Sequence, residues 1–197
     1  HLQVCGFKVY GDGALGSRGA LLKQAYADKP GHFGFLIHSI DKLDSIAKAI
    51  AEIGYQMNTH CIGDSAHKAL LDIFIRRTVN LPDHRWRIEH AQVIDPADLK
   101  LYEKSGIIPS VQPIHATSDM YWAEDRVGAA RIKNSYAYKT ILNKAGLLAL
   151  GTDFPIEEVD GDLDEGYYAP SLSPMRIPTQ DDGDADPPIP AAGKEID

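Results

Sequence analysis

Cysteine is scarce in this sequence, because the 197 residues include only Cys5 and Cys61. The two form no CxxC pair and are too few for a disulfide framework, so we predict that both are buried thiols in a reducing compartment. The chain also has no apolar run of about 18 residues that could span a membrane. Its N-terminus lacks the charged-then-apolar pattern of a signal peptide. These absences favour a cytoplasmic location without a membrane partner.

A surplus of basic residues is also missing. The formal net charge is −8, and residues 161–197 hold nine of the 28 acidic residues but two of the 20 basic ones. Residues 1–160 are therefore close to neutral and carry no basic stripe, which argues against nucleic acid as a partner. The C-terminal stretch also holds six of the 12 prolines. We predict a folded part over residues 1–160 and an acidic, proline-rich, poorly ordered tail over residues 161–197.

The sequence does contain a repeated unit of helix, glycine and strand. Residues 40–53 place apolar side chains at helical spacing up to Gly54, after which residues 55–59 alternate as a strand. That strand leads to His60. Three more predicted strands lead to a polar residue in the same way: residues 86–89 to His90, 107–111 to Gln112, and 147–150 to Asp153. Strands that alternate with amphipathic helices indicate an α/β fold with a parallel sheet, and in a (β/α)8 barrel the reacting groups come from the C-terminal strand ends.

Two further stretches bear on a site. Lys8 lies inside residues 4–10, VCGFKVY, which we predict to be a buried strand. A lysine cation is costly to bury, so Lys8 snorkels, pairs with an acid or is chemically modified, and an edge-strand lysine is an equally good interpretation. Residues 113–128 are too long for a minimal connection, and we predict a loop there that shapes a pocket.

The strand-end residues include the ligand types of a divalent metal ion. Imidazole nitrogens and a carboxylate oxygen suit zinc, so His60, His90 and Asp153 form a predicted metal site. A single histidine at a strand end is more often a hydrogen-bonded core residue. The common register of all three favours the metal.

Six motifs, taken in order, carry a resemblance to a known family. They are FKVYGDGALGSR, NTHCIGD, RIEHAQ, SVQPIHA, YWAEDRVG and LGTDFP, and together they span about residues 7–158. This series resembles the carboxyl-side part of the amidohydrolase superfamily, in its family-3 branch of metal-dependent hydrolases. The resemblance implies a TIM-type (β/α)8 barrel, here about five βα units of an incomplete barrel, with one or two metal ions. It also implies hydrolysis of amide-like, non-peptide C–N bonds in a small-molecule substrate.

The resemblance assigns roles to single residues. Lys8 is similar to the strand-four lysine that bridges two metal ions once carboxylated, and His60 and His90 are similar to the ligands on strands five and six. Asp153 resembles the strand-eight aspartate that binds metal and moves a proton from the attacking water to the leaving nitrogen. A metal ion acidifies its water to a pKa of about 7, so an adjacent carboxylate can manage that proton. The residues expected to contact the substrate are Arg18, Gln112, His115 and Trp122.

One motif of that family has no counterpart in this sequence. The family's first strand carries HxH, whereas none of the eight histidines here lies two positions from another. Strands one to three also have no counterpart, so the chain is expected to be part of a barrel, with sheet edges left unpaired. One alternative is therefore an inactive barrel fragment with a binding or structural role. Another is a metal-free isomerase or aldolase in which Lys8 forms a Schiff base. A homo-oligomer is compatible with either.

Overall fold

The computed structural model describes residues 2, 4–157 and 175–176. Its elements follow one another as β1 (Gly6–Tyr10), α1 (Ile40–Glu52), β2 (Gln56–Cys61), α2 (Asp64–Thr78), β3 (Arg87–His90), η1 (Pro96–Tyr102), β4 (Ile108–Val111), α3 (Pro113–Ser118), α4 (Ala123–Arg131), η2 (Ile132–Asn134), α5 (Tyr138–Ala145), β5 (Leu147–Leu150) and β6 (Met175–Arg176). Apart from β6, the predicted tail over residues 161–197 lies outside the described residues. Among the described helices, none has the length and apolar character that crossing a membrane requires.

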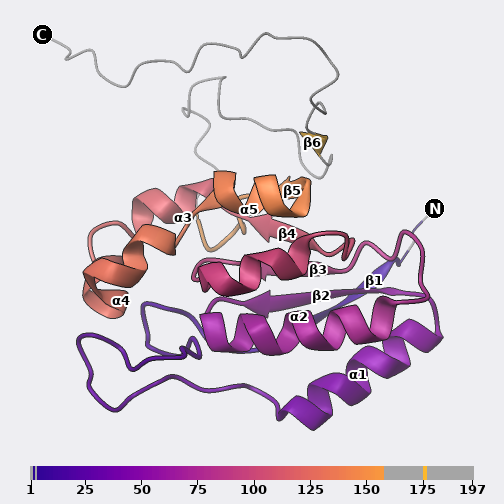
Figure 1. The fold of residues 1–197 in the computed structure, drawn as a ribbon, viewed down its shortest axis with the longest axis horizontal. Coiled ribbons are helices and arrows are strands. Elements are labelled where there is room, and N and C mark those ends of the chain that lie inside the picture. The colour runs from indigo at the N-terminus through magenta and orange to yellow at the C-terminus, as the bar shows by residue number, and fades with distance from the viewer. Residues whose placement is uncertain (1, 3, 158–174, 177–197) are drawn as a thin grey trace, which may run out of the picture.

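The sheet has the order β1-β2-β3-β4-β5-β6. Its first five strands are parallel, and β6 pairs antiparallel with β5. The predicted α/β fold with five parallel strands is therefore confirmed. All five strands run toward the same end of the sheet, where the long loop after β1 and helices α3 and α4 gather (Figure 1). That end is where a parallel sheet presents polar groups to a ligand.

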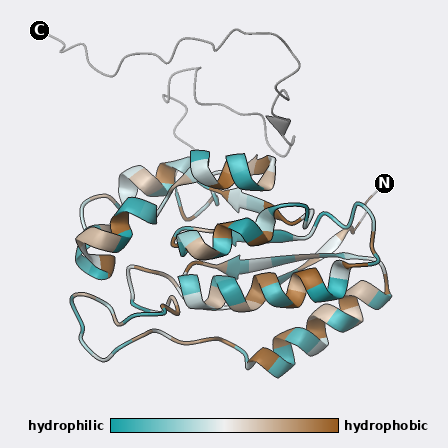
Figure 2. Ribbon diagram, viewed as in Figure 1, coloured by the Kyte–Doolittle hydropathy of each residue, from teal (hydrophilic) through white to brown (hydrophobic). Residues whose placement is uncertain are grey.

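Helix α1 illustrates how the sequence pattern produces the layers. Ser39 caps its first turn by accepting a hydrogen bond from the backbone N–H of Lys42. Three apolar side chains at helical spacing, Leu43, Ala47 and Ile50, face the core, and hydrophilic residues alternate with them along the helix (Figure 2). The chain then leaves the helix at Gly54, whose φ of 72° is left-handed and therefore favours glycine.

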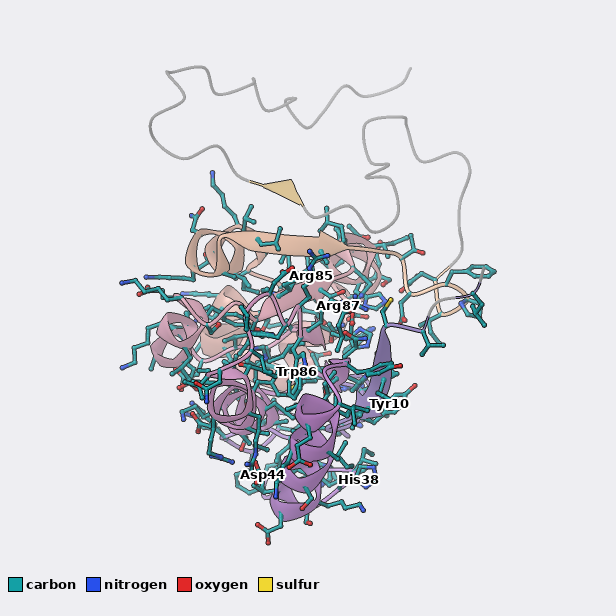
Figure 3. The ribbon with its side chains drawn as sticks, turned by 90° about the vertical axis from the view of Figure 1, so that its right-hand side faces the viewer. Tyr10, His38, Asp44, Arg85, Trp86 and Arg87 are labelled. Carbon is teal, nitrogen blue, oxygen red and sulfur yellow. The ribbon has the colours of Figure 1, made fainter. Side chains whose placement is uncertain are left out.

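The main core lies between the sheet and its helices. Trp86, just before β3, is fully buried, meets Phe74 of α2 edge to face at 4.9 Å between ring centroids, and donates its indole N–H to the carbonyl of Tyr55. Figure 3 shows Trp86 inside the molecule and Tyr10 at the edge on β1. Burial of large apolar side chains is the dominant stabilising term in such a layered fold.

The pleat of β2 sorts its side chains onto two faces. Met57, Thr59 and Cys61 are fully buried on the face that packs against the helices. The alternate residues, including Asn58 and His60, lie half-buried on the opposite face. We call this opposite face the inner face, and it carries one row of side chains in register across the sheet: Tyr10, His60, Glu89, Ser110 and Ala149.

A second, smaller core lies beyond the carboxyl ends of the strands. It joins the loop after β1 to Ile62, Val93 and Val127, with Leu15 and Tyr26 as its largest buried members. Two arginines of α4 fasten this loop by donating to backbone carbonyls: Arg126 to Gly16, and Arg131 to Gln24 and Ala25. These contacts place the loop and α4 as one cover over the strand ends.

Three sequence predictions about local structure are wrong. Residues 4–10 are not a buried strand, because among the described residues β1 has a hydrogen-bonded neighbour on one side only, and Phe7 and Tyr10 are exposed. Cys5 precedes that strand and is exposed, whereas Cys61 is buried as predicted. Residues 113–128 do not form an open loop, since Pro113 begins α3 and the chain continues into α4.

Candidate metal centre at the strand ends

His60 and His90 come together at the carboxyl ends of β2 and β3. Their ring centroids are 4.5 Å apart and the rings meet edge to face. His60 reaches this position by the ordinary pleat, but His90 pairs in register with Cys61, and a regular strand would turn its side chain toward the helices. The φ of His90 is 76°, and the φ of the next residue, Ala91, is 46°. This left-handed turn costs on the order of 1 kcal/mol and re-aims the imidazole toward His60.

A hydrogen bond fixes the orientation of the His90 ring. Its Nδ1 lies 2.8 Å from the side-chain oxygen Oε1 of Gln112 at the end of β4. An amide oxygen only accepts, so Nδ1 carries the proton and Nε2 keeps its lone pair. Gln112 was predicted from the sequence to contact the substrate, and the structure places it against His90.

Both imidazoles are neutral at neutral pH. Burial lowers the pKa of His60 to about 4, and the charge of His90 acts in the same direction. Burial likewise lowers the pKa of His90 to about 4, against the hydrogen bond that its Nδ1–H donates to Gln112, which raises it. A neutral imidazole offers a nitrogen lone pair, which is the form that binds metal ions.

Lys8 and Asp153 lie within electrostatic range of the two histidines. Lys8 is on the exposed edge strand beside Asn58, with its Nζ 5.6 Å from the ring centroid of Tyr10. Partial desolvation lowers the pKa of Lys8, whereas the carboxylates of Glu89 and Asp153 act to raise it. Asp153 follows β5 in a left-handed conformation with φ 59°, and its charge acts to raise the pKa of His60. Lys8 and Asp153 thus lie near the histidine pair, but within the described residues His60, His90 and Asp153 are not assembled into the three-ligand set that the sequence predicted.

The remaining residues that were predicted to contact the substrate are His115, Trp122 and Arg18. His115 of α3 stacks on His90 at 5.9 Å, and its Nε2 lies 3.8 Å from Glu157. Trp122 caps α4 with the guanidinium of Arg126 5.7 Å from its ring centroid. Arg18 lies in the loop after β1 and forms a two-point ion pair with Asp28. Of these side chains, His115 contacts the histidine pair directly.

Asp12 is a site residue that the sequence analysis missed. It lies two residues after β1 and is buried, with one carboxylate oxygen 3.8 Å from Nε2 of His60. Burial raises the pKa of Asp12 to about 7, although its backbone N–H donors favour the anion. An acid inside a glycine-rich stretch, directly after a predicted strand, was the only signal in the sequence.

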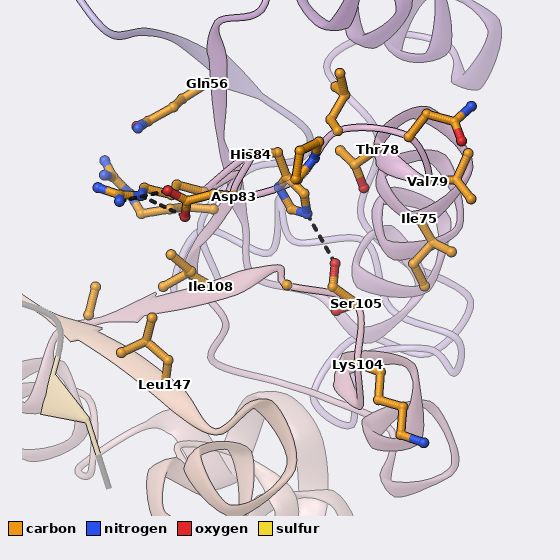
Figure 4. A pocket seen from close by; sticks show the side chains of 17 residues that line it. Gln56, Ile75, Thr78, Val79, Asp83, His84, Lys104, Ser105, Ile108 and Leu147 are labelled. Carbon is orange, nitrogen blue, oxygen red and sulfur yellow. Dashed lines mark hydrogen bonds and ion pairs between the residues drawn. The ribbon is translucent and has the colours of Figure 1, made fainter.

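A large cavity lies elsewhere. It has a volume of about 1050 Å³ and opens at the amino ends of the strands, where His84 bonds to the carbonyl of Ser105 (Figure 4). Gln56, Arg87 and Leu147 reach it from the inner face. None of the predicted site residues lines it, so the histidine pair at the opposite end remains the candidate site.

The family profile decides the relationship of this chain to known proteins. The profile of the amidohydrolase family matches residues 1–161. The chain belongs to the amidohydrolase family. The predicted family-3 resemblance is thereby confirmed.

Relatives of this amidohydrolase-family chain are known from several organisms. Protein LONG AFTER FAR-RED 3 of Arabidopsis thaliana is 35% identical over 162 residues, which are 81% of this chain and 28% of that protein. The putative amidohydrolase YtcJ of Bacillus subtilis is 35% identical over 160 residues, 81% of this chain and 30% of that protein. The chain therefore spans less than a third of the length of either protein.

Two solved structures share the fold. A metal-dependent hydrolase from Pyrococcus horikoshii matches with a TM-score of 0.72 and 34% identity, over 80% of this chain and 31% of that one. A metal-dependent hydrolase from Pyrococcus furiosus matches with a TM-score of 0.72 and 33% identity, over 80% and 32%. The five parallel strands with their helices are thus a part of a TIM-type barrel, as the sequence predicted.

The histidine pair of this amidohydrolase-family chain fits a divalent ion. Both rings are neutral, they lie side by side, and Gln112 leaves the Nε2 lone pair of His90 free. Across residues 2, 4–157 and 175–176, no three His, Cys, Asp or Glu side chains are grouped as a ready set of ligands. Two imidazoles alone leave a metal ion short of its usual four ligands, so an ion here would need ligands besides His60 and His90.

Proposed function

We propose that this chain forms part of a metal-dependent hydrolase that cleaves C–N bonds of amide-like, non-peptide small molecules. One observation carries the proposal: the neutral pair His60 and His90, with the ring of His90 turned toward its neighbour by a left-handed residue and held by Gln112. Strained backbone at the end of a buried strand is typical of a functional site. The family membership and the metal-dependent hydrolases of similar fold support the same class of reaction.

In this proposal His60 and His90 hold one or two divalent ions, with zinc as the proposed metal because it favours imidazole. A bound ion would acidify a water molecule and polarise the carbonyl of the substrate. Lys8 is the proposed further ligand. Its lowered pKa enlarges the fraction of neutral amine, which adds to carbon dioxide and releases a proton to give a carbamate. A carboxylated Lys8 would offer anionic oxygen in place of the lysine cation.

Asp153 is the proposed proton carrier. Its carboxylate would accept a proton from the attacking water and return it to the leaving nitrogen as the C–N bond breaks, so that the enzyme ends unchanged. Arg18, Gln112, His115 and Trp122 are proposed to contact the substrate. His115 is the best placed of these four, because it stacks on His90 and its buried Nε2 has no hydrogen-bond partner among the described residues.

One observation favours a second candidate function, that of a catalytically inactive barrel segment with a binding or structural role. Within the described part of the chain, no group of three ligating side chains is preassembled. A two-imidazole site would hold a metal ion weakly on its own. Metal affinity therefore separates the two candidates.

The test measures zinc binding by the 197-residue chain with calorimetry and metal analysis. His60→Ala and His90→Ala should each weaken binding at least ~100-fold, beyond the roughly 10–100-fold that an outer-sphere change costs. His84→Ala is the matched control, since His84 lies at the amino ends of the strands. Equal binding by all three variants would eliminate the proposed site. Hydrolysis of N-acyl and formamide substrates is then assayed in the whole protein that contains this chain.

A further inference from the structure

We propose that Asp12 is a positioning residue that orients His60, an inference that deepens the proposed function and rests on it. Oδ1 of Asp12 lies 3.8 Å from Nε2 of His60, and the two side chains are 0% and 12% exposed. That nitrogen is buried and has no hydrogen-bond partner among the described residues. A buried ring nitrogen that lies beside a buried carboxylate is the juxtaposition that carries the proposal, and a backbone group of Gly13 also acts on this ring.

Backbone hydrogen bonds hold the Asp12 carboxylate in place independently of His60. Oδ1 accepts the backbone N–H of Ile62 at 3.0 Å, and Oδ2 accepts those of Leu21 at 2.9 Å and Gly63 at 2.8 Å. These donors come from the end of β2 and from the loop after β1. Asp12 therefore links the loop after β1 to the end of β2 beside His60, and cannot easily move away from it.

The position of the carboxylate selects one form of the neutral ring. A lone pair on Nε2 would face the carboxylate oxygens and be repelled, whereas an N–H there is attracted. The separation is about 0.8 Å longer than an ordinary N–H···O bond, so the attraction is electrostatic. Asp12 thus favours the proton on Nε2 of His60 and leaves the lone pair on Nδ1.

Each of the two imidazoles then has one ring nitrogen oriented by a neighbouring polar side chain. Gln112, at the end of β4, holds His90 through Nδ1, and Asp12, beyond the end of β1, holds His60 through Nε2. Metal-binding histidines typically direct their second ring nitrogen to such an outer partner, and loss of that partner typically costs 10–100-fold in metal affinity. Each histidine would present its other nitrogen to an ion.

The first measurement needs no variant and no metal. In the metal-free chain labelled with ¹⁵N-histidine, at about pH 8, long-range ¹H–¹⁵N spectra report which ring nitrogen of His60 carries the proton. We expect the Nε2–H form. The Nδ1–H form would overturn the proposal whether or not the chain binds metal, so this result is independent of the proposed function.

The second measurement compares Asp12→Asn with Asp64→Asn. Asp64 is the matched control, because it is also a buried carboxylate that accepts a backbone N–H, from Lys23 in the same loop, but it is not paired with His60. Asp12→Asn should reduce the Nε2–H fraction and weaken Co²⁺ binding by about 10–100-fold, with an altered cobalt absorption spectrum. Asp64→Asn should change neither. Equal losses in both variants, or none in Asp12→Asn, would show a merely structural carboxylate and overturn the proposal.

Discussion

Replacing His67 by glutamine should reduce the loss of unfolding free energy that occurs when the pH is lowered from 7 to 5. His67 lies on α2, is fully buried and shares a 2.8 Å hydrogen bond with the hydroxyl of Tyr102. Burial lowers its pKa from 6.5 to about 3, and the charge of Lys23 acts in the same direction. The side chain therefore stays neutral in the folded protein over a range in which the unfolded chain takes up a proton.

The sign and size of the effect follow from this difference in proton uptake. Below pH 6.5 the unfolded state gains a proton at His67, and the folded state does not until about pH 3. The contribution to stability is thus fully present above the unfolded pKa and is lost as the pH falls through this window. Between pH 7 and pH 5 the loss amounts to about 2 kcal/mol of unfolding free energy.

Urea unfolding at pH 7 and pH 5 measures this contribution. The difference in unfolding free energy between the two pH values should be about 2 kcal/mol smaller in His67→Gln than in the parent. Phe74→Leu is the control, because Phe74 is buried on the same helix and has no ionisable group. It should lower stability by a similar amount at both pH values. An unchanged pH difference in His67→Gln would refute the reasoning.

Three further predictions follow from the core and the site. Trp86→Ala should lower the unfolding free energy by about 3–5 kcal/mol in urea unfolding, because it empties a fully buried site and leaves the Tyr55 carbonyl without its donor; a loss below about 1 kcal/mol would contradict this packing. Gln112→Leu should weaken zinc binding about 10–100-fold in calorimetry without changing the fold, and undiminished affinity would remove the assigned role of the amide. Asp153→Asn should slow hydrolysis by the whole protein at least ~100-fold while metal binding weakens less; near-normal turnover would exclude the proposed proton carrier.

Local patterns in the sequence determined the elements of the fold. The three-and-four spacing of Leu43, Ala47 and Ile50 and the glycine stop at Gly54 define α1, because helical periodicity is a property of neighbouring residues. Alternation in the next stretch defines β2. The recurrence of this unit predicted a parallel sheet, and parallel strands necessarily bring their carboxyl ends to one side, which placed His60 and His90 together.

The tertiary structure alone decided how the site is assembled. By strand alternation His90 would face the helices, and only its left-handed backbone turns it toward His60. Asp12 and His60 are 48 positions apart, and no local pattern predicts that a loop carboxylate will be fixed by backbone donors of Ile62 and Gly63. Contacts between distant segments depend on how the loop after β1 folds over the strand ends. Secondary structure follows from neighbouring residues, whereas the orientation of each ring follows from what the completed fold places beside it.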